Sequence, residues 1–193
     1  MIRRIWNKIL LKTLYRWNAK FLFGKVGSGT YCIKPLRIIN GRYATIGSNC
    51  SILHFLRLEI YNERNDSLEV VKIGDGTNIE QNVHITAGKG ITIGKNCSIL
   101  AGSVITDIKH PYENVDIPAS QTEHECKTVE IGDQCFIGTH SMIMPGVTLG
   151  KHVIVGANSV VTHSFPDKCV VAGVPAKMLK RYDDKLQEWV SCL

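Results

Sequence analysis

Aliphatic residues recur at every sixth position in the C-terminal half of the chain. Between 131 and 161 the sequence reads IGDQCFIGTHSMIMPGVTLGKHVIVGANSVV, and the sixfold positions are Ile131, Ile137, Ile143, Leu149, Val155 and Val161. Because six is an even number, residues six apart project to the same side of an extended chain. Glycine follows four of these positions and supplies the backbone freedom that a corner needs. The repeat therefore predicts a coiled stack of short strands, a β-solenoid.

The same period occurs earlier, with slips of two residues. The positions in register are Ile73, Ile79 and Ile85, then Ile93, Ile99 and Ile105, and, more weakly, Val26, Cys32, Ile38, Ile46, Ile52 and Leu58. We therefore predict that most of residues 26–175 forms one solenoid. Two polar stretches, 59–72 and 106–130, interrupt the period. The second has two prolines and is predicted to be a loop that protrudes from the stack, and loops of that length are usually functional or disordered.

Composition agrees with one cytoplasmic domain. The chain has 193 residues, 44% of them hydrophobic, and it contains neither an apolar run of 18 residues nor a cleavable signal sequence. Seven cysteines without a CxxC pair argue against a disulfide framework or a zinc finger. Cys50, Cys97 and Cys135 each follow a repeat isoleucine by four residues, a position that Thr77 shares. We expect these thiols to fill buried corners.

The first 25 residues form a separate basic segment. It carries seven of the 23 lysines and arginines, and the first acidic residue is Glu59. Apolar residues, including Trp6 and Trp17, recur there at spacings of three and four, which predicts an amphipathic helix over residues 1–25. Such a helix either caps the open first coil or lies in an anionic membrane surface. Nucleic-acid binding is disfavoured, because the excess basic charge is confined to this segment.

The strings at 155–161 (VGANSVV) and 172–177 (AGVPAK), with a His-Pro pair at His110 in the long loop, make a specific combination. In these features the chain resembles the left-handed β-helix (hexapeptide-repeat) acyltransferases. It is most similar to the maltose and galactoside acetyltransferases and to the related O-antigen and capsule sugar O-acetyltransferases. The resemblance covers residues 26–181 and implies the left-handed turn of the solenoid. Residues 182–193 are predicted to form a short C-terminal helix.

The resemblance implies a homotrimer that binds acetyl-CoA as co-substrate between neighbouring solenoids and needs no metal. It assigns the general base to His110, whose neutral imidazole could take the proton of a sugar hydroxyl. Asn82 and His84 lie where the family positions its substrates, and His84 is a second candidate for the base. Four loop acids could orient an imidazole, namely Asp107, Asp116, Glu123 and Glu125.

The resemblance also implies a set of residues for acetyl-CoA. Thr139, Ala157 and Gly173 would line the pantetheine arm, with Phe136 against it, and Thr162 and His163 would lie near the nucleotide. The basic residues Lys177, Lys180 and Arg181 would pair with its phosphates.

The predicted activity is acetyl transfer to a sugar hydroxyl, and the basic N-terminal segment favours a surface-polysaccharide precursor at the inner face of the membrane. An antibiotic or an amino sugar is an alternative acceptor. A γ-type carbonic anhydrase, which holds zinc with three histidines on the same solenoid, is an alternative of another reaction class. In that reading, His124 and its neighbours Glu125 and Cys126 offer a possible metal cluster.

Overall fold

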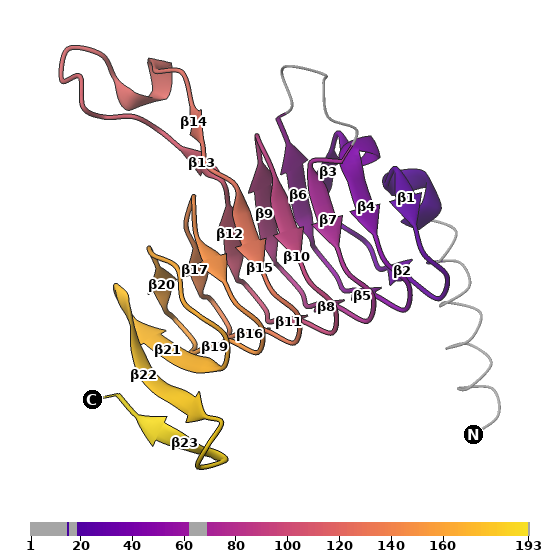
Figure 1. The fold of residues 1–193 in the computed structure, drawn as a ribbon. Coiled ribbons are helices and arrows are strands. Elements are labelled where there is room, and N and C mark those ends of the chain that lie inside the picture. The colour runs from indigo at the N-terminus through magenta and orange to yellow at the C-terminus, as the bar shows by residue number, and fades with distance from the viewer. Residues whose placement is uncertain (1–14, 16–18, 62–68, 193) are drawn as a thin grey trace.

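The computed structural model describes residue 15 and residues 19–61 and 69–192. Within these ranges the chain winds through three parallel sheets, here called A, B and C, which form the sides of a solenoid (Figure 1). Each coil crosses sheet A, then B, then C, before the chain returns to sheet A one level further along. The left-handed parallel β-helix that the repeat and the resemblance predicted is confirmed.

The strands are two to four residues long in the regular coils. Sheet A contains β1 (Lys25–Val26), β4 (Ala44–Ile46), β7 (Val71–Ile73), β10 (Ile91–Ile93), β15 (Val129–Ile131) and β18 (Thr148–Leu149). Sheet B contains β2 (Tyr31–Cys32), β5 (Ser51–Ile52), β8 (Asn78–Ile79), β11 (Ser98–Ile99), β16 (Phe136–Ile137), β19 (Ile154–Val155), β21 (Cys169–Gly173), β22 (Ala176–Asp183) and β23 (Glu188–Ser191). Sheet C contains β3 (Arg37–Ile39), β6 (Arg57–Ile60), β9 (His84–Ala87), β12 (Val104–Thr106), β17 (Met142–Ile143) and β20 (Val160–Val161).

The sixfold positions point into the solenoid. Ile79, Ile85, Ile99, Ile105 and Ile137 are fully buried. They stack on their counterparts in neighbouring coils, because the parallel strands pair in register, as in Ile79 with Ile99 and Ile99 with Ile137. The hydrophobic period therefore fixes both the inward face of each strand and the stacking of the coils.

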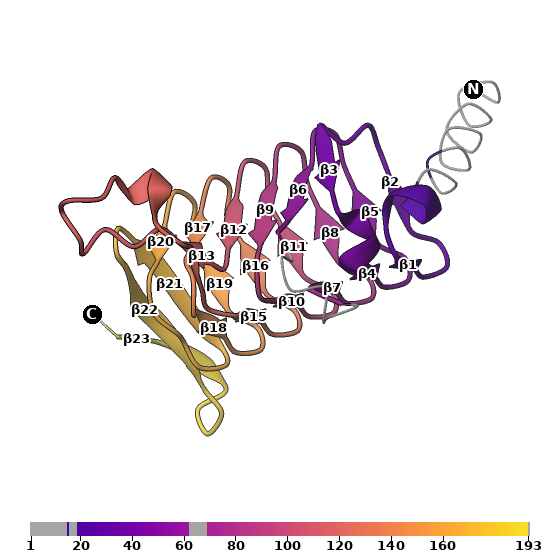
Figure 2. The ribbon, with the colours of Figure 1, turned by 90° about the horizontal axis from the view of Figure 1, so that it is seen from above.

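Departures from the period collect at one edge, where the chain passes from sheet C to sheet A. The 3-10 helix η1 (Gly41–Tyr43), the turn 88–90 and the loop 107–128 lie at that edge, and 10 residues separate β6 from β7 there. Figure 2 shows the loop extending beyond the stacked coils. The connections from sheet A to sheet B and from sheet B to sheet C all have the same number of residues between β7 and β20. Insertions are thus accommodated on one side of the solenoid.

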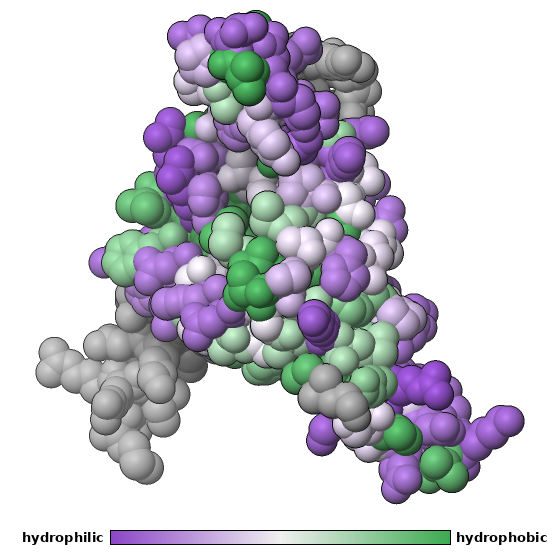
Figure 3. Space-filling view, turned by 90° about the vertical axis from the view of Figure 1, so that its left-hand side faces the viewer, coloured by the Kyte–Doolittle hydropathy of each residue, from purple (hydrophilic) through white to green (hydrophobic). Residues whose placement is uncertain are grey.

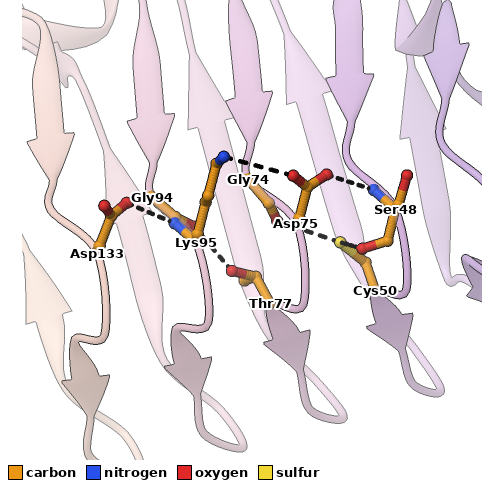
Figure 4. A network of polar contacts seen from close by, with 8 residues as sticks. All are labelled: Ser48, Cys50, Gly74, Asp75, Thr77, Gly94, Lys95 and Asp133. Atoms are coloured by element: carbon orange, nitrogen blue, oxygen red, sulfur yellow. Dashed lines mark hydrogen bonds and ion pairs between the residues drawn. The ribbon is translucent and has the colours of Figure 1, made fainter.

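Side-chain hydrogen bonds join successive coils at the edge between sheets A and B (Figure 4). The hydroxyl of Thr77 donates to the carbonyl oxygen of Gly94 at 2.8 Å and accepts the backbone N–H of Cys97 at 3.1 Å. The thiols of Cys50 and Cys97 donate in the same way to carbonyls of the next coil, at 3.2 and 3.1 Å. This column of small polar groups satisfies corner backbone groups that the sheets leave unpaired.

The corner cysteines are buried, as expected. Cys50, Cys97 and Cys135 are at most 1% exposed, and Cys32 and Cys169 are buried as well. All the cysteines of the described residues are free thiols. Burial raises the pKa of Cys32 to about 12 and that of Cys169 to about 11. A thiol with such a pKa is protonated at neutral pH and is a poor nucleophile.

The prediction of a short C-terminal helix is wrong. The chain reverses after β21 and continues as the antiparallel hairpin β22–β23, which extends sheet B. The turn is held by the carboxylate of Asp183, which accepts the backbone N–H groups of Lys185 and Leu186. Trp189 packs edge-on against Tyr182 across the hairpin. Pairing with the free edge of β21 outweighs the local helical tendency of this segment.

Most of the expected N-terminal helix lies outside the described residues. Residues 19–22 are helical, and β1 begins at Lys25. Ala19 and Phe23 are buried in the core of the first coils, whereas Phe21 is 78% exposed. The described end of this segment therefore packs on the solenoid.

We predict that Thr77→Val destabilises the protein by about 1–3 kcal/mol, because the Cys97 amide and the Gly94 carbonyl lose their buried partner while side-chain volume is kept. Thr92→Val is the matched control, since Thr92 lies on the exposed face of β10. Urea denaturation measures both variants. Equal stability of the two variants would contradict the role given to the Thr77 hydroxyl.

Candidate functional site

The long loop leaves sheet C after β12 and returns to sheet A at β15. Its base is a short antiparallel pair, β13 (Ile108–Lys109) with β14 (Glu125–Cys126), and a 3-10 helix, η2 (Ala119–Gln121), lies near its tip. Lys109 forms ion pairs with Glu113 at 2.6 Å and with Glu125 at 3.8 Å, which join the two arms. In Figure 3 the loop lies at the top of the view and is mainly hydrophilic.

Asp107 fixes the root of this loop. It is fully buried, and its carboxylate accepts three backbone N–H groups, from Gly88, Lys89 and Gly90, at 2.6–2.8 Å. The backbone carbonyl of Asp107 accepts the N–H of Lys127, where the loop returns. Asp107 therefore holds the loop to the turn of the preceding coil and is not available to orient His110.

His110 lies on the loop beyond β13. Its ring contacts the ring of His124 edge-on, with centroids 4.3 Å apart. Among the described residues no carboxylate hydrogen-bonds to this imidazole, and Glu125 pairs with Lys109 instead. Asp116 and Glu123 are exposed. The sequence suggested an acidic partner for His110, and the structure gives it a second histidine.

His84 lies in a different environment, on the outward face of sheet C at the start of β9. Its Nε2 is 2.8 Å from the hydroxyl of Thr86 and 3.5 Å from Oε2 of Glu59. Glu59 is also bound by Arg57 at 2.9 Å and by Arg37 at 3.2 Å. Although Glu59 belongs to the outward face of β6, it is only 3% exposed.

These groups shift one another's pKa values. Burial alone would raise the pKa of Glu59, but the hydrogen bond and charge of Arg57 and the charge of Arg37 outweigh it, so the pKa is lowered. The pKa of His84 is lowered by burial and by the charge of Arg57, against the opposing effect of Glu59. His84 is therefore neutral at neutral pH, as a general base must be.

Sequence reasoning missed Glu59, Arg57 and Arg37. The alternation of β6 signals that Arg57 and Glu59 share one face, but their meeting with His84 depends on the register of the coils. That register pairs Arg37 with Arg57 and Arg57 with His84.

Asn82 occupies the corner before His84, with a positive φ of 58°. Its backbone N–H donates to the carbonyl of His54 in the preceding coil at 3.0 Å. Its position matches a left-handed corner conformation, which asparagine tolerates well. Asn82 and His84 therefore lie close together along the chain, at the beginning of one strand of sheet C.

The residues expected to bind the donor lie on two sides of sheet C. Thr139 and Ala157 occupy successive corners between sheets B and C, where the N–H of Asn158 donates to the carbonyl of Thr139. Phe136 lies on the outer face of sheet B and is 40% exposed. Gly173 ends β21 with a φ of 108°, and its N–H donates to the Ser159 hydroxyl at 3.1 Å.

Thr162 and His163 lie at the other edge, after β20, where the ring of His163 packs on Phe165. Lys177, Lys180 and Arg181 lie on β22 and are exposed. Within the described residues none of these three forms an ion pair, so their charges face solvent.

Two family models match the chain. The model described as bacterial transferase hexapeptide (six repeats) matches residues 128–163, and the hexapeptide repeat of succinyl-transferase matches residues 70–107. These matches cover coils on both sides of the long loop. The chain carries the hexapeptide repeats of the bacterial transferases. The predicted resemblance is therefore confirmed.

Relatives by sequence are sugar and small-molecule acetyltransferases. The putative lipopolysaccharide biosynthesis O-acetyl transferase WbbJ of Escherichia coli is 38% identical over 92 residues, 44% of this chain and 47% of that protein. The galactoside O-acetyltransferase of Escherichia coli is 40% identical over 57 residues, 30% of this chain and 28% of that protein. The alignments thus span less than half of the length of these curated relatives.

Solved structures match over more of the chain. A variant of AntD, an N-acyltransferase from Bacillus cereus in complex with dTDP and coenzyme A, has a TM-score of 0.74 and 25% identity, over 89% of this chain and 90% of that chain. A hexapeptide-repeat acetyltransferase of Vibrio cholerae, in complex with acetyl coenzyme A, has a TM-score of 0.64 and 28% identity, over 86% of this chain and 75% of that chain.

Within the described ranges no helix is long and apolar enough to cross a membrane. In the same residues no three His, Cys, Asp or Glu side chains converge as they would around a metal ion.

We predict that Asp107→Ala loosens the root of the loop, because three backbone N–H groups lose a charged acceptor, and that it lowers the stability by about 2–4 kcal/mol. Hydrogen exchange should accelerate at residues 88–90 more than elsewhere in the solenoid. Asp116→Ala is the control, since Asp116 lies in the same loop and is exposed. Unchanged exchange at 88–90 in the Asp107 variant would refute the anchoring role.

Proposed function

We propose that this protein is an acetyl-CoA-dependent O-acetyltransferase that acts on a sugar hydroxyl, as in a surface-polysaccharide precursor. The main support is the close structural similarity, over nearly nine-tenths of the chain, to acyltransferases that were crystallised with coenzyme A or acetyl coenzyme A. The similarity to a putative lipopolysaccharide O-acetyl transferase supports the sugar acceptor.

The chemistry requires a base, an acceptor hydroxyl and a thioester. The acceptor oxygen attacks the acetyl carbonyl while a neutral imidazole accepts the hydroxyl proton. The resulting oxyanion collapses, the C–S bond breaks, and the imidazolium returns the proton to the leaving sulfur. His110 is the proposed base, because it lies on the loop that extends beyond the coils (Figure 2). Asn82 and His84 are proposed to position the substrates.

We propose that the protein assembles as a homotrimer, with three equivalent acetyl-CoA sites between neighbouring solenoids. Phe136, Thr139, Ala157 and Gly173 would contact the pantetheine arm in each site, and Thr162 and His163 the nucleotide. The exposed charges of Lys177, Lys180 and Arg181 would bind its phosphates. Residues 1–25 are proposed to hold the cytoplasmic enzyme at an anionic membrane surface.

Acyl transfer to an amine is a second candidate, because the matched AntD structure is that of an N-acyltransferase. Release of free CoA, measured over paired acceptors that differ in one hydroxyl or amine, tests both proposals. Turnover with neither class of acceptor would refute both.

We predict that His110→Ala lowers kcat by about 10²–10⁴-fold while acetyl-CoA still binds, because a general base acts chiefly in the transition state. The stability should be retained, since His110 lies on an exposed loop. His84→Ala is the comparison. If the His84 variant is inactive and the His110 variant keeps most of its kcat, the base is His84.

The pH profile separates the two bases further. The lowered pKa of His84 means that a reaction based on His84 keeps its kcat/KM to a pH below about 6.5, the ordinary value for histidine. Glu59 raises the pKa of His84, so Glu59→Gln should shift the acid limb of the kcat/KM profile to lower pH if His84 is the base. An unchanged profile would exclude a His84-based reaction.

We predict that Lys177→Ala and Lys180→Ala together raise the KM for acetyl-CoA at least tenfold, because charge-assisted bonds to phosphate are lost. An acetyl-CoA analogue without the 3′-phosphate should show a much smaller change. Lys185→Ala, in the turn of the same hairpin, is the control. Equal losses with both donors would place the lysines away from that phosphate.

A further inference from the structure

A basic patch lies on the outward face of sheet C over its first three coils. It consists of Arg37 on β3, Arg57 on β6 and His84 on β9, which are directly paired along the sheet. We call this surface the Arg37–His84 patch. The equivalent outward positions in the later strands are apolar, and they are Val104, Met142 and Val160. The patch is therefore confined to one half of this face.

The patch has more positive than negative charge. Its two guanidinium groups share the single carboxylate of Glu59, which is 3% exposed, and His84 is neutral at neutral pH. The side chains of Arg37 and Arg57 are 59% and 43% exposed. Among the described residues Glu59 is the only carboxylate that pairs with either arginine. One positive charge is thus left without a counter-charge at the surface.

The arginines also have hydrogen-bond donors to spare. A guanidinium carries five N–H groups in a planar fork, and the ion pair with Glu59 engages each arginine through one nitrogen. Because Glu59 holds the two side chains from beneath, little conformational freedom remains to be lost when a ligand binds. A phosphate or carboxylate is the group that such forks recognise.

The patch is close to the root of the loop that carries His110. Thr106, where the loop that carries His110 begins, pairs with Thr86, and Thr86 pairs with Glu59 on the next strand. Neighbouring strands lie about 4.8 Å apart, so the root of the loop is within about 10 Å of the patch. In addition, the Nε2 atom of His84 faces Thr86 and Glu59. When Nε2 carries the proton, the lone pair of the His84 imidazole lies on Nδ1, on the side of the ring away from Thr86 and Glu59.

We propose that the Arg37–His84 patch binds an anionic group of the acceptor, so that the acceptor is a sugar carrying a phosphate or a carboxylate. Glu59 acts as a positioning residue for the two arginines and for His84. This inference rests on the proposed function for the identity of the acceptor as a sugar.

The test compares hexose 1-phosphates with the matching free hexoses, by calorimetry on the full-length protein. Wild-type protein should bind at least one hexose 1-phosphate at least tenfold more tightly than its free hexose. Arg37→Gln should weaken binding of that phosphate at least tenfold and leave the free hexose unchanged. Arg42→Gln is the matched control, because it removes the same charge from an exposed arginine that stacks on Tyr43 outside the patch.

A second variant guards against misfolding. Arg57→Gln alone leaves Glu59 with one fewer partner, so Arg57→Gln combined with Glu59→Gln removes both charges and leaves no buried carboxylate unpaired. The double variant keeps the net charge of the patch but loses one guanidinium fork and the carboxylate that orients Arg37. It should therefore bind the phosphate at least tenfold more weakly than wild type, with unchanged circular dichroism. Wild-type binding by both patch variants, or no preference for any hexose 1-phosphate over its hexose, would overturn the proposal.

The patch and the proposed function can fail separately. Phosphate binding that depends on Arg37, without release of CoA from acetyl-CoA, would refute the transferase and leave the patch as an anion site. Acetyl transfer to a neutral sugar, with kcat/KM unchanged by Arg37→Gln, would refute the patch and leave the transferase.

Discussion

The in-register stacking of coils is the constraint on which the rest of the structure depends. Each strand of two to four residues is stable only because the strands above and below it complete its hydrogen bonds and cover its aliphatic side chain. Corner groups such as the Thr77 hydroxyl must then meet the carbonyl of the next coil at the same place each time. A coil cannot change its path at these corners without breaking contacts on both sides.

Additional residues are therefore tolerated at the edge between sheets C and A, where the described insertions lie. This placement has a functional consequence, because the polar groups that a regular coil excludes are concentrated beside sheet C. The loop with His110 and the outward side chains of β6 and β9 share that neighbourhood through the paired residues Thr86 and Thr106. The solenoid supplies a rigid base for this chemistry, and Asp107 fastens the loop to it.

The sequence predicted most of the fold, because a hydrophobic period is a local signal that every coil repeats. It failed at the C-terminus, where the antiparallel hairpin depends on the free edge of β21, a non-local feature. The site was predictable only in part. His110 and His84 were found from motifs, but the contact of His110 with His124 depends on how a long loop closes. Arg37, Arg57 and His84 come from three coils at unequal spacings, because η1 and the connection 61–70 intervene, so only the register of the strands reveals them as neighbours.

Burial of the Glu59 carboxylate costs free energy, and an outward position on a strand does not require a buried carboxylate. Moving a carboxylate out of water is unfavourable, and an apolar side chain at such a position is often as stable as an ion pair. The next two strands of sheet C place neutral side chains, Thr86 and Thr106, in register with Glu59. Yet the pKa of Glu59 is lowered, so the attraction of two arginines more than offsets its burial. The arrangement holds two guanidinium groups and one imidazole in fixed orientations. Recognition of a charged acceptor needs such fixed orientations, whereas packing of the solenoid does not need them.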